Sequence, residues 1–106
     1  MAVKNISRER FVQLLPADFS VESSGGNQLE WWANERETIL GTVAKQKSNE
    51  GWLYVLLGRD GHGEFGVLSL ELGMNNLHAA RLRLLQAIES CDCYGSRRGW
   101  HCDLYH

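Results

Sequence analysis

The residue types best suited to hold a metal ion gather near the C-terminus, as Cys91, Cys93, His101, Cys102 and His106. Thiolates and imidazoles are the ligands that zinc prefers in proteins. The spacing argues against zinc, because a single residue separates the first two cysteines where zinc-binding pairs usually have two or more, and a histidine adjoins the last cysteine. We therefore predict no metal and no cofactor.

Carboxylates are the second group that could do chemistry. Glu30 lies in an apolar segment next to two tryptophans, and a desolvated carboxyl in such a place can act as a general acid or base. Glutamates at strand ends are more often solvated charges that discourage aggregation. We assign no catalytic residue, and keep as an alternative a small enzyme that uses Glu30 as its acid or base.

Charge and hydropathy exclude several classes of partner. The 106 residues carry a net charge of −2, and no motif of basic and aromatic residues typical of RNA-binding sheets occurs, so we expect no nucleic acid. No apolar run is long enough to span a bilayer, and the first residues lack the apolar core of a signal peptide. Three cysteines make no disulfide framework. These features favour a cytoplasmic protein without a membrane partner.

Four short apolar segments must position the candidate residues. They span about residues 29–33, 38–45, 52–57 and 65–70, and are rich in branched and aromatic side chains. The connections are short, and one contains Asp60-Gly61, a strong hairpin signal. Short connections force neighbouring strands to pair antiparallel. We predict a four-stranded antiparallel β-meander.

Two helices complete the prediction. Ser7 can cap a short N-terminal helix with Phe11, Leu14 and Leu15 on one side, ending before Pro16. Residues 75–89 read as a long C-terminal helix with an apolar stripe. The predicted fold class is therefore α+β, with a single domain over residues 1–90 and an irregular tail over residues 91–106.

Alternation along the strands sorts the side chains onto two faces, if each connection has an even number of unpaired residues. What we call the aliphatic face then carries Leu29, Trp31, Ala33, Leu40, Thr42, Ala44, Leu53, Val55, Leu57, Leu68 and Leu70. What we call the aromatic face carries Glu30, Trp32, Ile39, Gly41, Val43, Trp52, Tyr54, Leu56, Phe65, Val67 and Ser69. We expect the apolar stripe of the C-terminal helix to cover the aliphatic face.

The aromatic face then needs another cover, because exposed apolar patches of more than a few hundred Å² are rare on monomers. A homodimer contact is our first expectation, a small apolar or aromatic ligand the second, and the N-terminal segment folded across the face the third. The predicted interface or ligand site consists of Glu30, Trp32, Ile39, Gly41, Val43, Trp52, Tyr54, Leu56, Phe65 and Val67.

Three central stretches resemble short uncharacterised bacterial proteins associated with mobile elements such as integron gene cassettes. The residues that carry the resemblance are Leu29-Glu30-Trp31-Trp32-Ala33-Asn34, Ile39-Leu40-Gly41-Thr42-Val43 and Trp52 to Asp60. The resemblance implies a bacterial accessory protein and no particular activity. We therefore expect a small binding or interaction module; the alternatives are the enzyme above and a partner-neutralising protein like an antitoxin or immunity protein.

Overall fold

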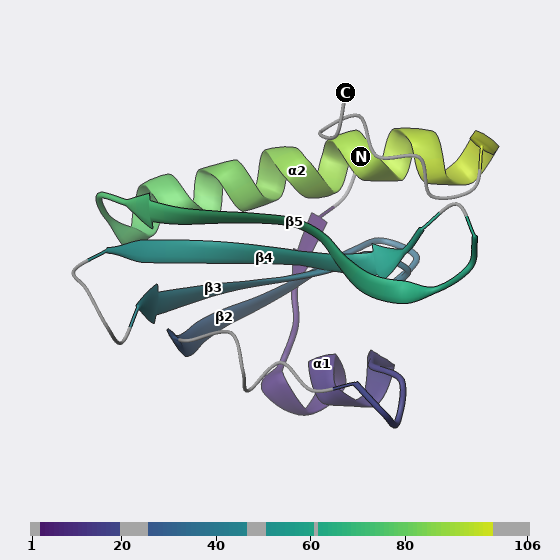
Figure 1. The fold of residues 1–106 in the computed structure, drawn as a ribbon, viewed down its shortest axis with the longest axis horizontal. Coiled ribbons are helices and arrows are strands. Elements are labelled where there is room, and N and C mark those ends of the chain that lie inside the picture. The colour runs from purple at the N-terminus through teal and green to yellow at the C-terminus, as the bar shows by residue number, and fades with distance from the viewer. Residues whose placement is uncertain (1–2, 20–25, 47–50, 61, 99–106) are drawn as a thin grey trace.

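The computed structural model describes residues 3–19, 26–46, 51–60 and 62–98 (Figure 1). The elements follow in the order β1 (Val3–Asn5), α1 (Arg8–Leu14), β2 (Gly26–Asn34), β3 (Leu40–Gln46), β4 (Trp52–Arg59), β5 (Phe65–Met74) and α2 (Leu77–Arg98). The predicted α+β class with an antiparallel sheet is confirmed. Neither helix of the described part is long and apolar enough to cross a membrane.

Within the described residues the sheet has five strands, so the prediction of four was wrong. Its strands lie in chain order from β1 to β5, and every neighbouring pair is antiparallel. The additional strand, β1, has only three residues, Val-Lys-Asn, and pairs with the end of β2. Three residues are too few to show an alternating apolar pattern, which is why the sequence did not reveal this strand.

Side-chain hydrogen bonds fix the turn between β2 and β3. The Oδ1 atom of buried Asn34 accepts from the backbone N–H groups of Thr38 at 2.8 Å and Ile39 at 2.9 Å. Its Nδ2 donates to Thr38 Oγ1 at 2.8 Å. Within the turn Glu37 has a φ of 59°, a left-handed conformation that the surrounding hydrogen bonds hold in place.

The turn between β4 and β5 follows the hairpin prediction. Asp60 N–H donates to the Glu64 carbonyl at 2.9 Å, and Asp60 Oδ1 accepts from His62 N–H at 2.8 Å and Glu64 N–H at 3.0 Å. Gly63 has a φ of 82°, which a residue with a side chain rarely adopts. These bonds lower the pKa of the Asp60 carboxyl, above all the one from Glu64 N–H.

Helix α2 covers the aromatic face, so the prediction that it covers the aliphatic face was wrong. Its Leu84 and Ile88 are buried against a cluster from β3, β4 and β5 that includes Val43, Tyr54 and Leu56. A Cβ atom at Gly41 would lie 3.0 Å from Leu84 Cγ, and it would lie closer to Leu84 Cδ1 than real Cβ contacts come. Because Gly41 has no side chain, β3 leaves space for Leu84 of α2 on this face.

Helix α1 covers the aliphatic face on the other side of the sheet (Figure 1). Its Phe11 is fully buried and packs with Leu40, Leu53 and Leu57. Ser7 caps the helix, because its Oγ accepts from Arg10 N–H at 3.0 Å, as the sequence predicts. The molecule thus has three layers, with the sheet between two helices and an apolar core on each side.

An irregularity between β4 and β5 moves Phe65, Val67 and Leu68 to the face opposite the predicted one. Leu56 is opposite Ser69, whereas Leu57 is opposite Val67, so Leu68 is an extra residue in β5. Leu68 belongs to the core under α2. Phe65 packs on the α1 side, where its ring lies 5.0 Å from that of Phe19. The prediction assumed an even number of unpaired residues in each connection, and that assumption does not account for a bulge within a strand.

Helix α2 begins at Leu77 and ends at Arg98, whereas the prediction placed it over residues 75–89. Asn76 Oδ1 accepts from Ala79 N–H at 2.8 Å at its start. We expected the helix to end at Glu89 and an irregular tail from Cys91, but the helix continues to Arg98. The rest of the predicted tail over residues 91–106, from residue 99 onward, lies outside the described residues.

Candidate binding site at the edge of strand β2

Most of the predicted interface residues are core residues in the structure. Helix α2 buries Ile39, Gly41, Val43 and Leu56, and Tyr54 is 4% exposed with its hydroxyl 3.2 Å from Ser69 Oγ. Trp52 lies at the margin of this core beneath the Lys45 ammonium. Phe65 packs on the α1 side. Helix α2 therefore occupies the place that we expected a second subunit or a ligand to fill.

Two of the predicted site residues, Glu30 and Trp32, border a pocket at the edge of β2, and the reason is the length of β1. Strand β1 pairs only with Trp32, Ala33 and Asn34 of β2. The chain then leaves the sheet towards α1 after one more backbone hydrogen bond, from Ile6 N–H to the Trp31 carbonyl at 2.9 Å. Among the described residues, no strand lies beside Gly26 to Glu30 on that side of β2.

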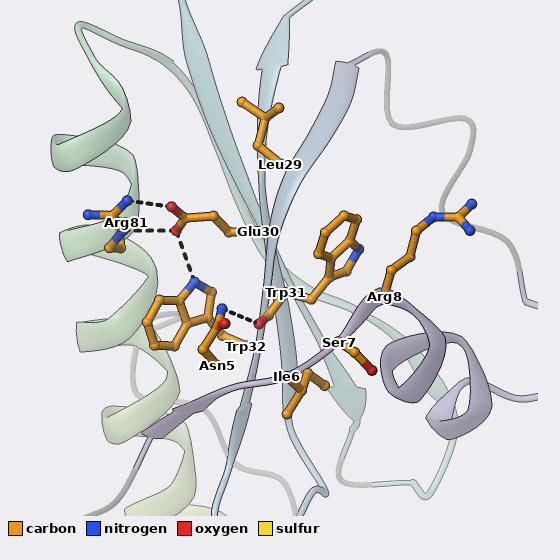
Figure 2. Close-up of a pocket in the computed structure, with 9 residues that line it drawn as sticks. All are labelled: Asn5, Ile6, Ser7, Arg8, Leu29, Glu30, Trp31, Trp32 and Arg81. Carbon is orange, nitrogen blue, oxygen red and sulfur yellow. Dashed lines mark hydrogen bonds and ion pairs between the residues drawn. The ribbon is translucent and has the colours of Figure 1, made fainter.

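A pocket of about 580 Å³ lies at this notch in the sheet edge. Figure 2 shows β2 on its floor, α2 on one side and the segment leading into α1 on the other. The side chains of Trp31 and Trp32 point to opposite sides of the strand (Figure 2). The pocket is lined by Asn5, Ile6, Ser7, Arg8, Leu29, Glu30, Trp31, Trp32 and Arg81. Its volume is in the range of small-ligand and short-peptide sites.

An ion pair between β2 and α2 forms one wall of the pocket. Arg81 Nε donates to Glu30 Oε1 at 2.8 Å, and Arg81 Nη2 donates to Glu30 Oε2 (Figure 2). Trp32 Nε1 also donates to Glu30 Oε1, at 3.1 Å. The Arg81 guanidinium, followed by the Trp32 indole, holds the pKa of the Glu30 carboxyl below its usual value. Glu30 is thus an ionised, hydrogen-bonded carboxylate.

The opposite wall carries a cation with no such partner. Arg8 extends from the start of α1 on the same side of β2 as Trp31 (Figure 2). Among the described residues, no carboxylate forms an ion pair with it. Because Glu30 compensates the charge of Arg81, Arg8 leaves the pocket with one net positive charge.

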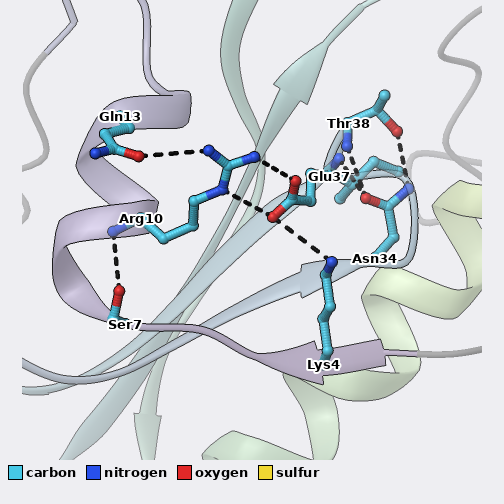
Figure 3. Close-up of polar contacts among 8 residues, drawn as sticks. Lys4, Ser7, Arg10, Gln13, Asn34, Glu37 and Thr38 are labelled. Atoms are coloured by element: carbon cyan, nitrogen blue, oxygen red, sulfur yellow. Dashed lines mark hydrogen bonds and ion pairs between the residues drawn. The ribbon is translucent and has the colours of Figure 1, made fainter.

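A second polar cluster ties α1 to the turn between β2 and β3 (Figure 3). Arg10 binds both carboxylate oxygens of Glu37, with Nε 3.0 Å from Oε2 and Nη2 2.6 Å from Oε1. The Lys4 ammonium lies 3.6 Å from the same carboxylate. The bonds from Arg10 hold the pKa of Glu37 below its usual value. All members of this cluster pair with one another, so we assign them the structural role of fixing α1 to the sheet.

Sequence reasoning identified two of the nine pocket residues as site residues, Glu30 and Trp32. It missed Arg81, because 51 residues separate it from Glu30 and no local pattern links them. It missed Arg8 and Ile6, because their place depends on β1, which was not predicted. Trp31 was assigned to the aliphatic face and expected to be structural.

The absence of a metal site stays a prediction. Within the part of the chain that the structure describes, no three His, Cys, Asp or Glu side chains are grouped to hold a metal ion. Cys91 is a residue of α2 and is buried in the core between this helix and the sheet. The Cys93 side chain and residues His101, Cys102 and His106 lie outside what the structure describes.

Comparison of the chain with protein-family models, with curated proteins and with solved structures gave no match in any of the three. The pocket is therefore interpreted from its own geometry.

Proposed function

We propose that the protein is a small, non-enzymatic binding module whose ligand occupies the pocket at the edge of β2. One observation carries the proposal: two indoles and a guanidinium without a carboxylate partner among the described residues border an open pocket, beside a stretch of strand edge with no described neighbour. Aromatic surface next to a few fixed polar groups is typical of binding sites.

The state of Glu30 favours binding over catalysis. A general acid or base at neutral pH needs a pKa near 7, whereas Arg81 and Trp32 lower the pKa of this carboxyl. The two arginine nitrogens and the indole nitrogen also occupy both carboxylate oxygens. The enzyme alternative therefore has less support than a binding role in which Glu30 holds Arg81 and Trp32 in position.

Nuclear magnetic resonance of the indole N–H groups tests the proposal. Trp31 and Trp32 line the pocket, whereas Trp52 lies at another margin of the α2 core and serves as an internal control. Titration with millimolar indole and benzamide should shift the Trp31 and Trp32 signals and leave Trp52 unchanged. A uniform response of all three, or none, would contradict a ligand site at β2.

Our second proposal is still a homodimer, but through a surface other than the aromatic face that the sequence predicted. Helix α2 covers the centre of the aromatic face, but β5 is an edge strand whose side chains Val67, Leu70 and Leu72 are 55%, 51% and 56% exposed. Val67 belonged to the predicted interface. An exposed apolar edge strand is prone to pair with another copy of itself.

The wider biological setting is proposed from the sequence resemblance alone. We infer a bacterial accessory protein of the kind associated with mobile elements. A partner-neutralising role is compatible with a binding module, and co-purification from the native host tests it.

A further inference from the structure

We propose that the natural occupant of the β2 pocket is a short, extended, acidic peptide segment that adds to the edge of β2 on the Leu29–Glu30 side of Trp31, whose carbonyl already accepts from Ile6 N–H and Asn5 Nδ2. This inference rests on the proposed binding function and specifies its ligand. Its basis is the combination of a strand edge and an arginine that have no partner among the described residues, with side chains on both sides of that edge.

The first argument is that, within the described residues, β2 has no neighbour beside Gly26 to Glu30. Strand β1 runs antiparallel to β2 up to Asn5 opposite Trp32, and the chain then turns away. A peptide that continued along the same line would pass directly over the pocket and could hydrogen-bond to the backbone of β2. Addition of a strand to an exposed sheet edge is a common mode of peptide recognition, in which backbone bonds supply much of the affinity.

The second argument is the arrangement of the walls. Successive side chains of an added strand point to opposite sides. On one side they would meet Trp31 and Arg8, and on the other Trp32 and the Glu30–Arg81 pair (Figure 2). A small compact ligand on one face would contact only one of these sets. An extended segment contacts both, which is why we favour it over a small aromatic molecule.

The bulge in β2 limits the length of the segment. The pairing with β3 shifts between Gln28 and Glu30, so that Leu29 has no partner in β3 and is 46% exposed. A bulge at a sheet edge interrupts the regular spacing of backbone groups and prevents extended pairing. With Trp31 already bonded to Ile6, the regular part of the free edge among the described residues is Gly26 to Gln28, which limits the paired part of the segment to about three residues at roughly 3.3 Å per residue.

Charge indicates an acidic residue in the segment. Arg81 is neutralised by Glu30, whereas Arg8 has no carboxylate partner among the described residues. A guanidinium binds a carboxylate through two parallel hydrogen bonds. A glutamate or aspartate that points towards the α1 side of the added strand would supply that carboxylate next to the Trp31 ring.

Three capped pentapeptides test the inference by calorimetry and by backbone amide shifts of the full chain. The first has the sequence threonine-valine-glutamate-valine-threonine, the second has lysine in place of glutamate, and the third is the first peptide with its two valine amides N-methylated. We expect the first to bind and to shift the amides of Leu29 to Trp31. The lysine peptide should bind about threefold more weakly, as for an exposed ion pair. The methylated peptide should bind about tenfold more weakly.

Variants separate the role of Arg8 from general charge effects. In Arg8→Gln the glutamate and lysine peptides should bind equally. Arg83→Gln is the matched control, because Arg83 is an exposed arginine on α2 that pairs with Glu71 away from the pocket. That variant should keep the threefold preference.

The outcomes distinguish this inference from the proposed function. If indole and benzamide shift Trp31 and Trp32 but no peptide binds, the binding module stands and the peptide inference is overturned. Equal affinity of the methylated and unmethylated peptides would also overturn it, since backbone pairing would then contribute nothing. If neither the fragments nor the peptides bind at β2, both proposals fail.

Discussion

Gly41 of β3 lies directly beneath Leu84 of α2, and a Cβ atom at Gly41 would lie 3.0 Å from Leu84 Cγ and closer still to Cδ1. We expect Gly41→Val to destabilise the fold by about 1–3 kcal/mol, because it overpacks a core that has no spare space. Urea unfolding measures the change.

Gly66→Ala in β5 is the control for Gly41, because no atom lies within 4 Å of a Cβ built at Gly66. That variant should stay within about 0.5 kcal/mol of the parent. The double variant Gly41→Val with Leu84→Ala should be more stable than the sum of the two single changes predicts. If the changes in the free energy of unfolding were strictly additive, Gly41 and Leu84 would not be in contact.

Asn34 should be among the most sensitive polar residues of the chain. Replacement by Ala removes the acceptor for the N–H groups of Thr38 and Ile39 and leaves the Ile39 N–H buried. We expect a loss of about 2–3 kcal/mol in the free energy of unfolding. Asn34→Asp keeps the acceptor oxygen and should lose less at neutral pH; an equal loss for both variants would show that the two backbone bonds are not the cause.

Stability should fall in acid partly because of Glu30. Arg81 lowers the pKa of Glu30 in the folded protein from its usual value of 4.5, so the folded state binds fewer protons than the unfolded state near that pH. The ion pair therefore contributes in full above about pH 4.5, and its contribution is lost as the pH falls through the lowered value. Urea midpoints measured from pH 7 to pH 3 should decrease less in Glu30→Gln than in the parent. Parallel curves would contradict the assignment.

Self-association should depend on β5. We expect light scattering at high micromolar concentration to give a dimer for the parent and a monomer for Leu70→Lys, because a buried charge opposes pairing of apolar edges. Leu82→Lys is the matched control, since Leu82 is an equally exposed leucine (49%) on α2 and not on the edge strand. A parent that is monomeric throughout would remove the homodimer proposal.

The middle of the sheet was predictable from the sequence because alternation fixes it locally. Trp31, Thr42 and Val55 share a face as expected, and so do Trp32, Gly41 and Leu56. The side covered by α2 was not predictable, since an apolar helix stripe fits either face of a sheet that is apolar on both. The deciding contact, Gly41 with Leu84, joins residues far apart in the chain.

The candidate site was only partly predictable for a related reason. Glu30 and Trp32 stood out by residue type, but the pocket exists because β1 stops at Asn5. A three-residue strand has no sequence signature, and a bulge such as the one at Leu68 has none either. The residue at which a short strand such as β1 ends determines which part of the neighbouring strand it leaves without a partner.

The strand order of the sheet has a consequence for how the chain is made. Because β1 to β5 lie side by side in the order of synthesis, each strand from β2 onward finds its partner already emerged when it leaves the ribosome. Sheet contacts between neighbours along the chain close short loops, which favours rapid folding. Helix α2 emerges last, so until then the growing hairpins expose the apolar surface around Val43 and Leu56, and nascent chains would be most vulnerable to aggregation in that interval.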